Sequence, residues 1–339
     1  MVALAHSAVL KNYFDVSHQL GMNTYPLLSS AGLCSNQLRD TKQRIPIDKA
    51  IHLLESSALL SGCQAFGLRM AEQRELSDFG EISLLLHYQH TLRDALDVIV
   101  RYRSFFNHSL AIYVEEVGNT VIIREEVVSQ DSPYSRQATE LAVGIMHRFC
   151  ATLVSHHWRP MSIHFTHSAP HDLSLHRRMF GCKLEFGSEF NGIVCRKADL
   201  DSTNPLANPA MANHAQRFLD ILEKNHQSSL ISDIRQSIYL LLPMGRATID
   251  QIAHIHGLNV RTLQRRLEAQ QCRFSDLVND ARRQMVFRYL SNPHYTLAQV
   301  SEILGYATPS SFTRWFITQF QMTPSAARIS VTGNMLIAS

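Results

Sequence analysis

The sequence predicts two domains: an α+β domain over about the first two hundred residues, then an all-α domain in which a linker helix joins two helix-turn-helix units. Three observations predict this arrangement. Segments of helical periodicity precede strand-like segments, a helix-turn-helix pattern occurs twice about fifty residues apart, and a long helical stretch separates its two copies. With 339 residues, 45% of them hydrophobic, the chain is long enough to bury two cores.

The N-terminal elements follow from the spacing of apolar residues. Helical spacing occurs in two early segments, 47–62 and 91–106. Apolar residues then alternate on both sides of Gly118-Asn119, as in a β-hairpin. A helix is expected from about Arg136 to Ser155, followed by a strand at 161–167, a short helix after Pro170, and strands at 183–186 and 192–195. We expect an antiparallel sheet covered by helices.

The first helix-turn-helix unit begins in the segment 248–259. Thr248 is expected to cap a helix that buries two isoleucines, and Ala253 is small enough for two helices to cross closely there. Gly257 suits the left-handed end of a helix, and Asn259 caps the next one. This order of residues is typical of a helix-turn-helix, whose first helix braces the second.

The second helix of this unit has one apolar and one basic side. At ~100° per residue, three residues share the apolar side: Val260, Leu263 and Leu267. Four polar residues face away or flank them: Arg261, Thr262, Gln264 and Arg265. Arginine and glutamine pair bidentately with guanine and adenine edges in the DNA major groove. The alternative is an ordinary solvated helix face.

The second unit repeats the pattern between residues 296 and 316. Thr296 caps its first helix, Gly305 occupies the turn, and Thr308-Pro309 opens its second helix. Aligning the two second helices places Arg314 on Arg265, and it places Ser310 and Ser311 on Arg261 and Thr262. Two such units in one chain are much less expected by chance than one.

A linker helix and a local excess of positive charge accompany the two units. The segment 274–293 is predicted as one helix, which would hold the units about one DNA turn, ~34 Å, apart. The whole chain has a formal charge of +3, whereas residues 244–328 contain ten arginines and five acidic residues, a net +5. The basic charge therefore lies where DNA would bind.

At this point the chain resembles the AraC/XylS family of transcription regulators. The likeness rests on "ATIDQIAHIHGLNVRTLQRRL", "FSDLVNDARRQMVFRYL" and "TLAQVSEILGYATPSSFTRWFITQFQMTPSAAR", within about residues 245–328. The chain departs from the usual pattern at four positions. Gln271 and Gln321 stand where a helix-ending glycine is usual, Ser301 replaces an alanine, and Ile317 occupies a usually basic position.

The resemblance and the helix projection together imply a set of DNA contacts. We expect seven residues to read bases: Arg261, Gln264, Arg265, Ser310, Ser311, Thr313 and Arg314. Four others are expected at the sugar-phosphate backbone: Thr248, Thr262, Arg266 and Thr296. The implied partners are double-stranded promoter DNA and RNA polymerase, and the implied function is a regulator, expected to be an activator.

The N-terminal half is similar to the OruR/VqsM/VirS-like subgroup of the same family, whose N-terminal domain is labelled arabinose-binding-like. The likeness extends over about residues 20–210 and includes "FGLRMAE", "DFGEISLLLHYQHTLRDAL" and "LDSTNPLANP". It implies a domain that senses a small-molecule effector or mediates assembly. Sugar binding does not follow from the label. A small polar metabolite is expected, with ornithine or a related amino acid as the first candidate, and the pocket residues are unknown from the sequence.

An enzyme with a fused DNA-binding segment is the alternative function. Seven histidines occur within thirty residues, at positions 147, 156, 157, 164, 167, 171 and 176. Their spacings mix a helix, a loop and a strand, without a cysteine or carboxylate at ligand spacing. Cys182 and Cys195 have no base near them in sequence. We therefore expect no catalytic residues, no metal and no cofactor.

The chain also carries expectations about location and assembly. No signal peptide, membrane span or cysteine pairing pattern is present, so a cytoplasmic protein with reduced thiols is expected. The expected divisions are 1–205 for sensing, 206–228 for a connecting helix, 229–328 for DNA binding and 329–339 for a tail. In the connecting helix a 4-3-4 spacing predicts the seam of a homodimer at Met211, Ala215, Phe218 and Leu222, and packing on its own domain is the alternative.

Overall fold

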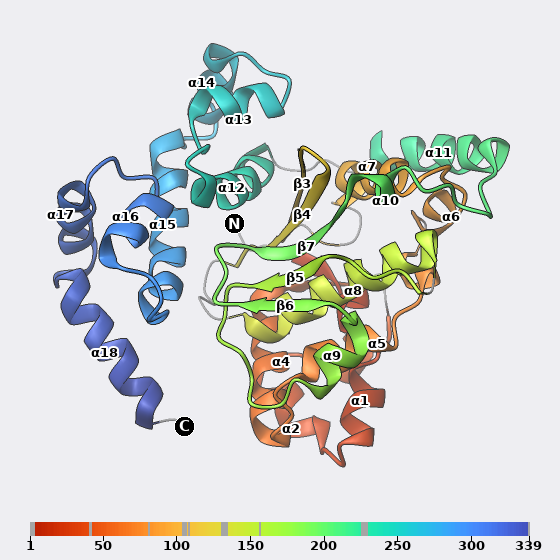
Figure 1. The fold of residues 1–339 in the computed structure, drawn as a ribbon, viewed down its shortest axis with the longest axis horizontal. Coiled ribbons are helices and arrows are strands. Elements are labelled where there is room, and N and C mark those ends of the chain that lie inside the picture. The colour runs from red at the N-terminus through yellow and green to blue at the C-terminus, as the bar shows by residue number, and fades with distance from the viewer. Residues whose placement is uncertain are drawn as a thin grey trace. The chain divides into compact units, whose positions relative to one another are not determined.

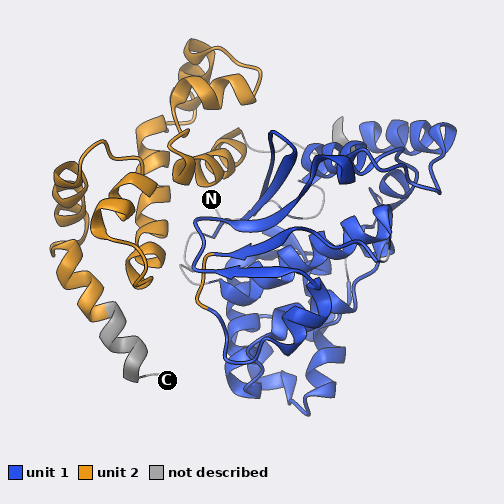
Figure 2. Cartoon of the chain, viewed as in Figure 1, with its two compact units in different colours: residues 1–165, 169–228 blue, residues 166–168, 229–339 orange. Residues whose placement is uncertain are grey.

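The structure is a computed structural model that describes residues 4–40, 43–80, 82–103, 107, 109–129, 135–155, 157–224 and 230–337. The chain divides into two compact units (Figure 2). The first comprises Met1–Phe165 and Ala169–Ser228, and the second comprises Thr166–Ser168 and Ser229–Ser339. The connecting segment 206–228 thus belongs to the first unit, and the helical unit begins at residue 229.

The first unit combines helices with two sheets. Its helices are α1 Tyr13–Gln19, α2 Thr24–Ser30, α3 Ser35–Arg39, α4 Ile47–Ser61, α5 Phe66–Glu72, α6 Ile82–His87, α7 Leu92–Tyr102, α8 Arg136–Val154, α9 Ser174–Phe180, α10 Lys197–Leu200 and α11 Pro209–Lys224. Short 3-10 helices occupy Ser7–Leu10 and Leu76–Phe79. The helices predicted at 47–62, 91–106 and 136–155 are confirmed as α4, α7 and α8, although residues 104–106 lie outside the described ranges.

The main sheet has five strands in the order β3-β4-β7-β5-β6 (Figure 1). The strands are β3 Leu110–Val117, β4 Thr120–Val127, β5 Ser162–Phe165, β6 Lys183–Phe186 and β7 Asn191–Arg196, and a smaller sheet pairs β1 Leu4–His6 with β2 Arg44–Pro46. The predicted hairpin is confirmed, with Gly118 at φ 61° between β3 and β4. The expectation of a fully antiparallel sheet was wrong for one pair, since β5 and β6 run parallel. The intervening helix α9 allows the crossover that a parallel pair requires.

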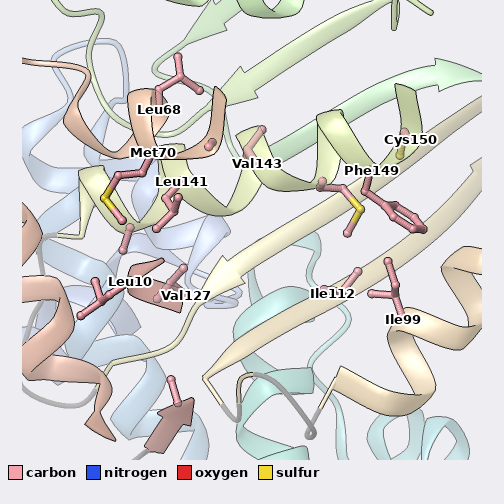
Figure 3. Close-up of a cluster of buried hydrophobic side chains, with 14 of the residues drawn as sticks. Leu10, Leu68, Met70, Ile99, Ile112, Val127, Leu141, Val143, Phe149 and Cys150 are labelled. Carbon is pink, nitrogen blue, oxygen red and sulfur yellow. The ribbon is translucent and has the colours of Figure 1, made fainter. Parts of the chain in front are cut away.

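The core of the first unit lies between the sheet and α8. Alternate residues of β4 are buried on the side that α8 covers. Figure 3 shows Val127 facing Leu141 of that helix, and Ile112 opposite the part of the helix that carries Phe149. On its other side α8 packs on α5 at close range. A Cβ added to Gly67 would lie 2.0 Å from the carbonyl oxygen of Gln137, and one added to Gly144 would lie 2.6 Å from the Cβ of Ala71. Both crossing positions therefore require glycine.

The second unit is helical throughout its described secondary structure. It contains α12 Leu230–Leu241, a 3-10 helix Leu242–Met244, α13 Ile249–Ile255, α14 Val260–Glu268, α15 Phe274–Ser291, α16 Leu297–Ile303, α17 Pro309–Phe320 and α18 Pro324–Ile337. In Figure 1, α13 and α14 lie at one end of α15, while α16 and α17 lie beside its other half. The predicted linker helix is confirmed as α15. Helix α18 continues past residue 328, into the segment expected to be a tail.

Candidate nucleic-acid interface

The first helix pair, α13 and α14, is closed by local hydrogen bonds. The Thr248 hydroxyl accepts a hydrogen bond from the backbone N–H of Gln251 (3.3 Å), which caps α13. The side-chain oxygen of Asn259 accepts from the N–H of Thr262 (2.8 Å), which caps α14. Gly257 between them has φ 63°, the left-handed conformation that glycine adopts at low cost. Both predicted caps and the predicted turn are confirmed.

The exposed side of α14 carries the expected DNA-reading residues. Leu263 and Leu267 are buried, while Val260, placed on the same side by the projection, is half-buried. Four polar residues of the helix are exposed: Arg261, Gln264, Arg265 and Arg266. Thr262 is half-buried beside the cap. The helix thus buries one side within its own unit and presents a positively charged side to solvent.

The arginines of α14 differ from those of the linker helix in their partners. Within the described part of the chain, no side-chain hydrogen bond or ion pair involves Arg261, Arg265 or Arg266, and neither Glu268 nor Glu302 braces Arg265. In α15, by contrast, each arginine has partners within the unit. Arg282 donates from Nε to the carbonyl oxygen of Leu304 (2.9 Å), Arg283 donates to Gln319 (2.7 Å) and pairs with Asp280, and Arg288 donates to the Tyr289 hydroxyl (3.3 Å).

The second helix pair, α16 and α17, repeats the local geometry with a different set of exposed groups. Thr296 and Gln299 form a capping box at the start of α16, and Thr308 caps α17. Ser310, Ser311 and Arg314 are exposed. The Ser311 hydroxyl, however, lies 2.9 Å from that of Thr308. Arg314 is therefore the one charged donor that α17 presents, whereas α14 presents three.

Two of the residues expected at the DNA backbone already have a structural role. The hydroxyl of Thr248 caps α13, and that of Thr296 accepts from the Gln299 N–H (3.2 Å) and donates to its side-chain oxygen (3.0 Å). Both residues are exposed at helix N-termini. The N–H groups of a helix N-terminus attract phosphate, and the contacts of Thr248 and Thr296 with the DNA backbone stay a prediction.

Linker helix α15 holds the turn of the second pair. Besides its bond to Leu304, Arg282 donates to the carbonyl oxygen of Gly305 (3.2 Å) and lies over the ring of Tyr306, 4.1 Å from its centroid. The hydroxyl of Ser301 donates to the carbonyl oxygen of Thr308 (3.2 Å). The serine found in place of the family's usual alanine therefore adds a hydrogen bond across the turn. Sequence reasoning had assigned no role to Arg282.

The two glutamines found where a helix-ending glycine is usual adopt the conformation of that glycine. Gln271 has φ 55° and Gln321 has φ 56°. Side chains with a Cβ are strained in this left-handed region by about 1–2 kcal/mol. The departure from the family pattern thus adds backbone strain at both turns.

The histidine-rich segment lies in the first unit and is divided among separate surroundings. Burial lowers the pKa of His147 to about 4, with the positive charges of Arg159 and Arg148 acting in the same direction. His164 lies between the hydroxyls of Ser162 (2.9 Å) and Ser188 (2.8 Å). His156 is outside the described residues. Among the described residues, no group of three histidine, cysteine, aspartate or glutamate side chains could hold a metal ion.

The two cysteines considered as nucleophiles are poorly suited to that chemistry. Burial raises the pKa of Cys182 to about 11 and that of Cys195 to about 12. Since the thiolate is the reactive form, both side chains are protonated and weakly nucleophilic at neutral pH.

Helix α11 places the predicted seam residues on two different sides. Ala215 is 5% exposed and, together with Leu219, belongs to the core of the first unit. Phe218 is 54% exposed, Met211 is also exposed, and the side chain of Leu222 lies outside the described residues. The neighbouring Ile221, which sequence reasoning missed, is 61% exposed. Of the residues expected in the seam, Ala215 thus packs on its own domain, as the alternative interpretation held.

These features define a class of protein: one with a double helix-turn-helix DNA-binding unit preceded by an α+β domain. Residues 21–204 match the family model described as the arabinose-binding domain of AraC transcription regulators, N-terminal, and residues 252–329 match a helix-turn-helix domain. The first match spans more than half of the chain. The chain therefore belongs to the AraC family of transcription regulators, as its sequence predicted.

Several characterised regulators are similar along most of their length. VirS of Mycobacterium tuberculosis is 26% identical over 328 residues, 96% of each chain. The ornithine utilization regulator of Pseudomonas aeruginosa is 21% identical and covers 93% of each chain, and VqsM of the same organism is 25% identical over 83% of this chain and 90% of its own. The solved structure of the regulator CdpR from P. aeruginosa aligns over 93% of this chain and 98% of that one, with 18% identity and a TM-score of 0.43. No described helix is long and apolar enough to cross a membrane.

Proposed function

We propose that this protein is an effector-responsive transcriptional activator that reads two successive major-groove segments of a promoter with α14 and α17. The observation that carries the proposal is the difference between the arginines of α14, which are exposed and have no partner in the described chain, and those of α15, which are bonded within the unit. Arginines free to pair bidentately with guanine are what base reading requires. Arg261, Gln264 and Arg265 read one segment, and Ser310, Ser311, Thr313 and Arg314 read the next.

Backbone contacts orient the protein on the duplex. The N-termini of α13 and α16, at Thr248 and Thr296, face phosphates, and Thr262 and Arg266 contact the strand beside α14. Such contacts bind all sequences alike, so they supply affinity without specificity.

A binding assay with matched charge removal tests this function. Full-length protein is titrated against the DNA upstream of its own gene and against a scrambled duplex of equal length, at a fixed salt concentration. The Arg261→Ala, Arg265→Ala double variant should lose the preference for the upstream DNA. A control lacking two exposed arginines of the first unit, Arg39→Ala with Arg69→Ala, should keep it. Equal binding of wild-type protein to both duplexes would overturn the proposal.

The assembly of the regulator is the second part of the proposal. We infer a homodimer whose subunits meet through α11, with Met211, Phe218 and Ile221 in the seam in place of Ala215. These three exposed apolar residues are spaced by seven and three positions, which supports a short coiled-coil contact. A dimer would place two DNA-binding units on one promoter, in the cytoplasm, next to RNA polymerase.

The effector is the third part. The family match supports a small molecule bound in the first unit, whose binding shifts the placement of the DNA-binding units and so changes transcription. An amino acid such as ornithine is a candidate because one similar protein is an ornithine utilization regulator. The cavity in the first unit favours a different class.

A further inference from the structure

The first unit contains a cavity between α8 and the β3-β4 hairpin. Its volume is about 110 Å³. One wall is a face of α8 with helical spacing, formed by Ala138, Leu141, Ala142, Ile145 and Met146. The opposite wall comes from the hairpin, where Leu110 pairs with Val127 and Ile112 pairs with Glu125. In Figure 3, Ile99, Ile112, Val127 and Leu141 lie around this space.

The walls are aliphatic and the cavity is reachable. Besides α8 and the hairpin, α4 contributes Ile47, Ile51 and Leu54. Ala142 and Ile145 are half-buried, so the space between the walls is not sealed. An apolar cavity of ~150 Å³ is known to hold a benzene molecule, so this smaller one has room for a hydrocarbon group of about four carbons, and a longer chain continues through its open side.

One polar group in the cavity wall is a buried carboxyl without a partner. Glu125 is 3% exposed, and its Oε2 makes no hydrogen bond in the described structure. Burial raises its pKa to about 8, so the carboxyl is protonated at neutral pH. A protonated carboxyl needs an acceptor for its proton, and the aliphatic residues around it have none.

A second polar group is a buried guanidinium with one free donor. Arg74 is 5% exposed, and it donates from Nη1 to the carbonyl oxygen of Ala8 (2.8 Å) and from Nη2 to that of Val9 (2.6 Å). Its Nε has no partner in the described structure. Asp78, which also lines the cavity, pairs with Lys11. When Glu125 is protonated it carries no charge. The remaining charged side chains are two cations, Arg74 and Lys11, and one anion, Asp78, so their net charge is positive.

We propose that this cavity binds an apolar carboxylic acid, whose hydrocarbon part lies against the aliphatic walls and whose oxygens accept hydrogen bonds from Arg74. Such a ligand supplies an acceptor for the free donor of Arg74 and a negative charge for a positive site, while its chain replaces water in an apolar space. The acid is the effector of the proposed regulator, and in that respect the inference rests on the proposed function.

Ornithine fits these walls less well. It carries two ammonium groups, which would have to leave water for a site with a net positive charge and few acceptors. Most of the surface available to it is the side chains of leucine, isoleucine, valine and alanine. The same argument disfavours a sugar, whose hydroxyls would lack partners.

Calorimetry on the full-length protein tests the cavity with three probes: octanoate, octanol and ornithine. Octanoate should bind with an affinity about tenfold or more above that of octanol, because only the carboxylate pairs with Arg74. Ornithine should not bind. Arg74→Lys keeps the charge but lacks the Nε donor, so it should reduce the octanoate-to-octanol ratio. Octanoate that binds no more tightly than octanol would overturn the carboxylate assignment.

A pair of variants on α8 tests the place of binding. Ala142→Phe fills the cavity and should abolish octanoate binding. Ala151→Phe makes the same change on the same helix, outside the cavity, and should leave it intact. Octanoate binding retained by Ala142→Phe would overturn the site. Promoter binding separates the two proposals. If the protein binds DNA sequence-specifically but does not bind octanoate, the cavity assignment alone is contradicted. If octanoate binds but changes neither DNA binding nor transcription, only its role as effector is contradicted.

Discussion

The guanidinium of Arg282 lies over the ring of Tyr306, 4.1 Å from its centroid, and thereby joins the linker helix to the turn of the second helix-turn-helix unit. Burial is the main cause that lowers the pKa of Arg282, and it raises that of Tyr306 to about 12. Neither group titrates near neutral pH. The contact is therefore constant under conditions in which the protein would bind DNA.

Arg282→Ala should destabilise the second unit by about 1–3 kcal/mol, because it removes the stacking and leaves the carbonyls of Leu304 and Gly305 without their donor. Urea unfolding followed by Trp315 fluorescence, with Trp158 replaced by Phe, measures this change in the second unit. Arg273→Ala, an exposed arginine just before α15 for which no side-chain partner is found in the described chain, is the matched control and should change stability by less than ~0.5 kcal/mol.

Arg265→Ala should weaken binding to the specific site by about 1–3 kcal/mol and relax the preference at about one base pair. The reason is that a bidentate contact to one base is lost while the phosphate contacts remain. Selection from a randomised DNA pool, followed by affinity measurement on single-substitution duplexes, reveals both effects. A loss that is equal for every DNA sequence would mean that Arg265 contacts phosphate instead.

Arg314→Ala should cost less affinity than Arg265→Ala. Helix α17 offers one arginine, its Ser311 hydroxyl is engaged with Thr308, and Thr313 is half-buried, so its interface with DNA is weaker from the start. Footprinting of both variants on the same promoter compares the two segments. If the footprint of wild-type protein covers a single major-groove segment and Arg314→Ala leaves it unchanged, the second unit does not dock.

The helix caps were predictable because their hydrogen bonds are local. Thr248, Asn259 and Thr308 each bond a backbone N–H three residues further on, which any sequence window of that length contains. The cavity was not predictable, since residues from Ala8 to Met146 line it. Glu125 in particular is followed by a second glutamate, Glu126, and nothing in the local sequence distinguishes the carboxyl that lines the cavity from its neighbour.

The side on which α11 packs was equally inaccessible to sequence reasoning. Its apolar residues follow a spacing that suits either a dimer seam or contact with the rest of the first unit. Contacts with α6 and a hydrogen bond from the Tyr102 hydroxyl to Asp220 (2.7 Å) decide the matter for Ala215 and Leu219. Tyr102 and α6 precede α11 by more than a hundred residues in the sequence, so the periodicity of α11 alone does not identify these partners.

Gln321→Gly should stabilise the second unit by about 0.5–1 kcal/mol. The substitution removes left-handed strain at φ 56°, and the greater freedom of glycine in the unfolded chain offsets part of the gain. The Trp315 fluorescence assay applies again. Gln319→Gly, two residues earlier and inside α17, is the control. It introduces glycine into a helix interior and also removes the acceptor of Arg283, so it should destabilise by about 1 kcal/mol or more. A destabilised Gln321→Gly variant would show that the glutamine side chain contributes more than its backbone strain costs.

Glu125→Gln should stabilise the first unit relative to wild type, and this advantage should be larger at high pH than at low pH. The pKa of Glu125 is raised from 4.5 to about 8, so folding keeps protonated a carboxyl that is ionised in the unfolded chain. The resulting loss of stability is absent below pH 4.5, grows as the pH rises, and is complete near pH 8.

Between about pH 5 and pH 8 the advantage of Glu125→Gln should increase by about 3 kcal/mol. Trp158 fluorescence in a Trp315→Phe background reports on the first unit, and neighbouring His147, with a pKa of about 4, stays neutral over this interval. Asp15→Asn, a change at an exposed carboxylate, should show no comparable trend. An advantage that is the same at both pH values would mean that Glu125 is ionised in the folded protein.

Phe218→Lys should convert the proposed dimer into monomers at micromolar protein concentration. Phe218 and Ile221 expose more than half of their side-chain surface on one side of α11, and a charge placed between two such helices would be buried without a partner. Analytical ultracentrifugation measures the change in mass. Leu60→Lys on α4, where the leucine is 65% exposed, places the same charge on another apolar surface residue and should leave the dimer intact. A dimer that survives Phe218→Lys excludes this side of α11 as the interface. Among the described residues of the helix, the only large apolar side chain as exposed as Phe218 is Ile221, which lies beside it.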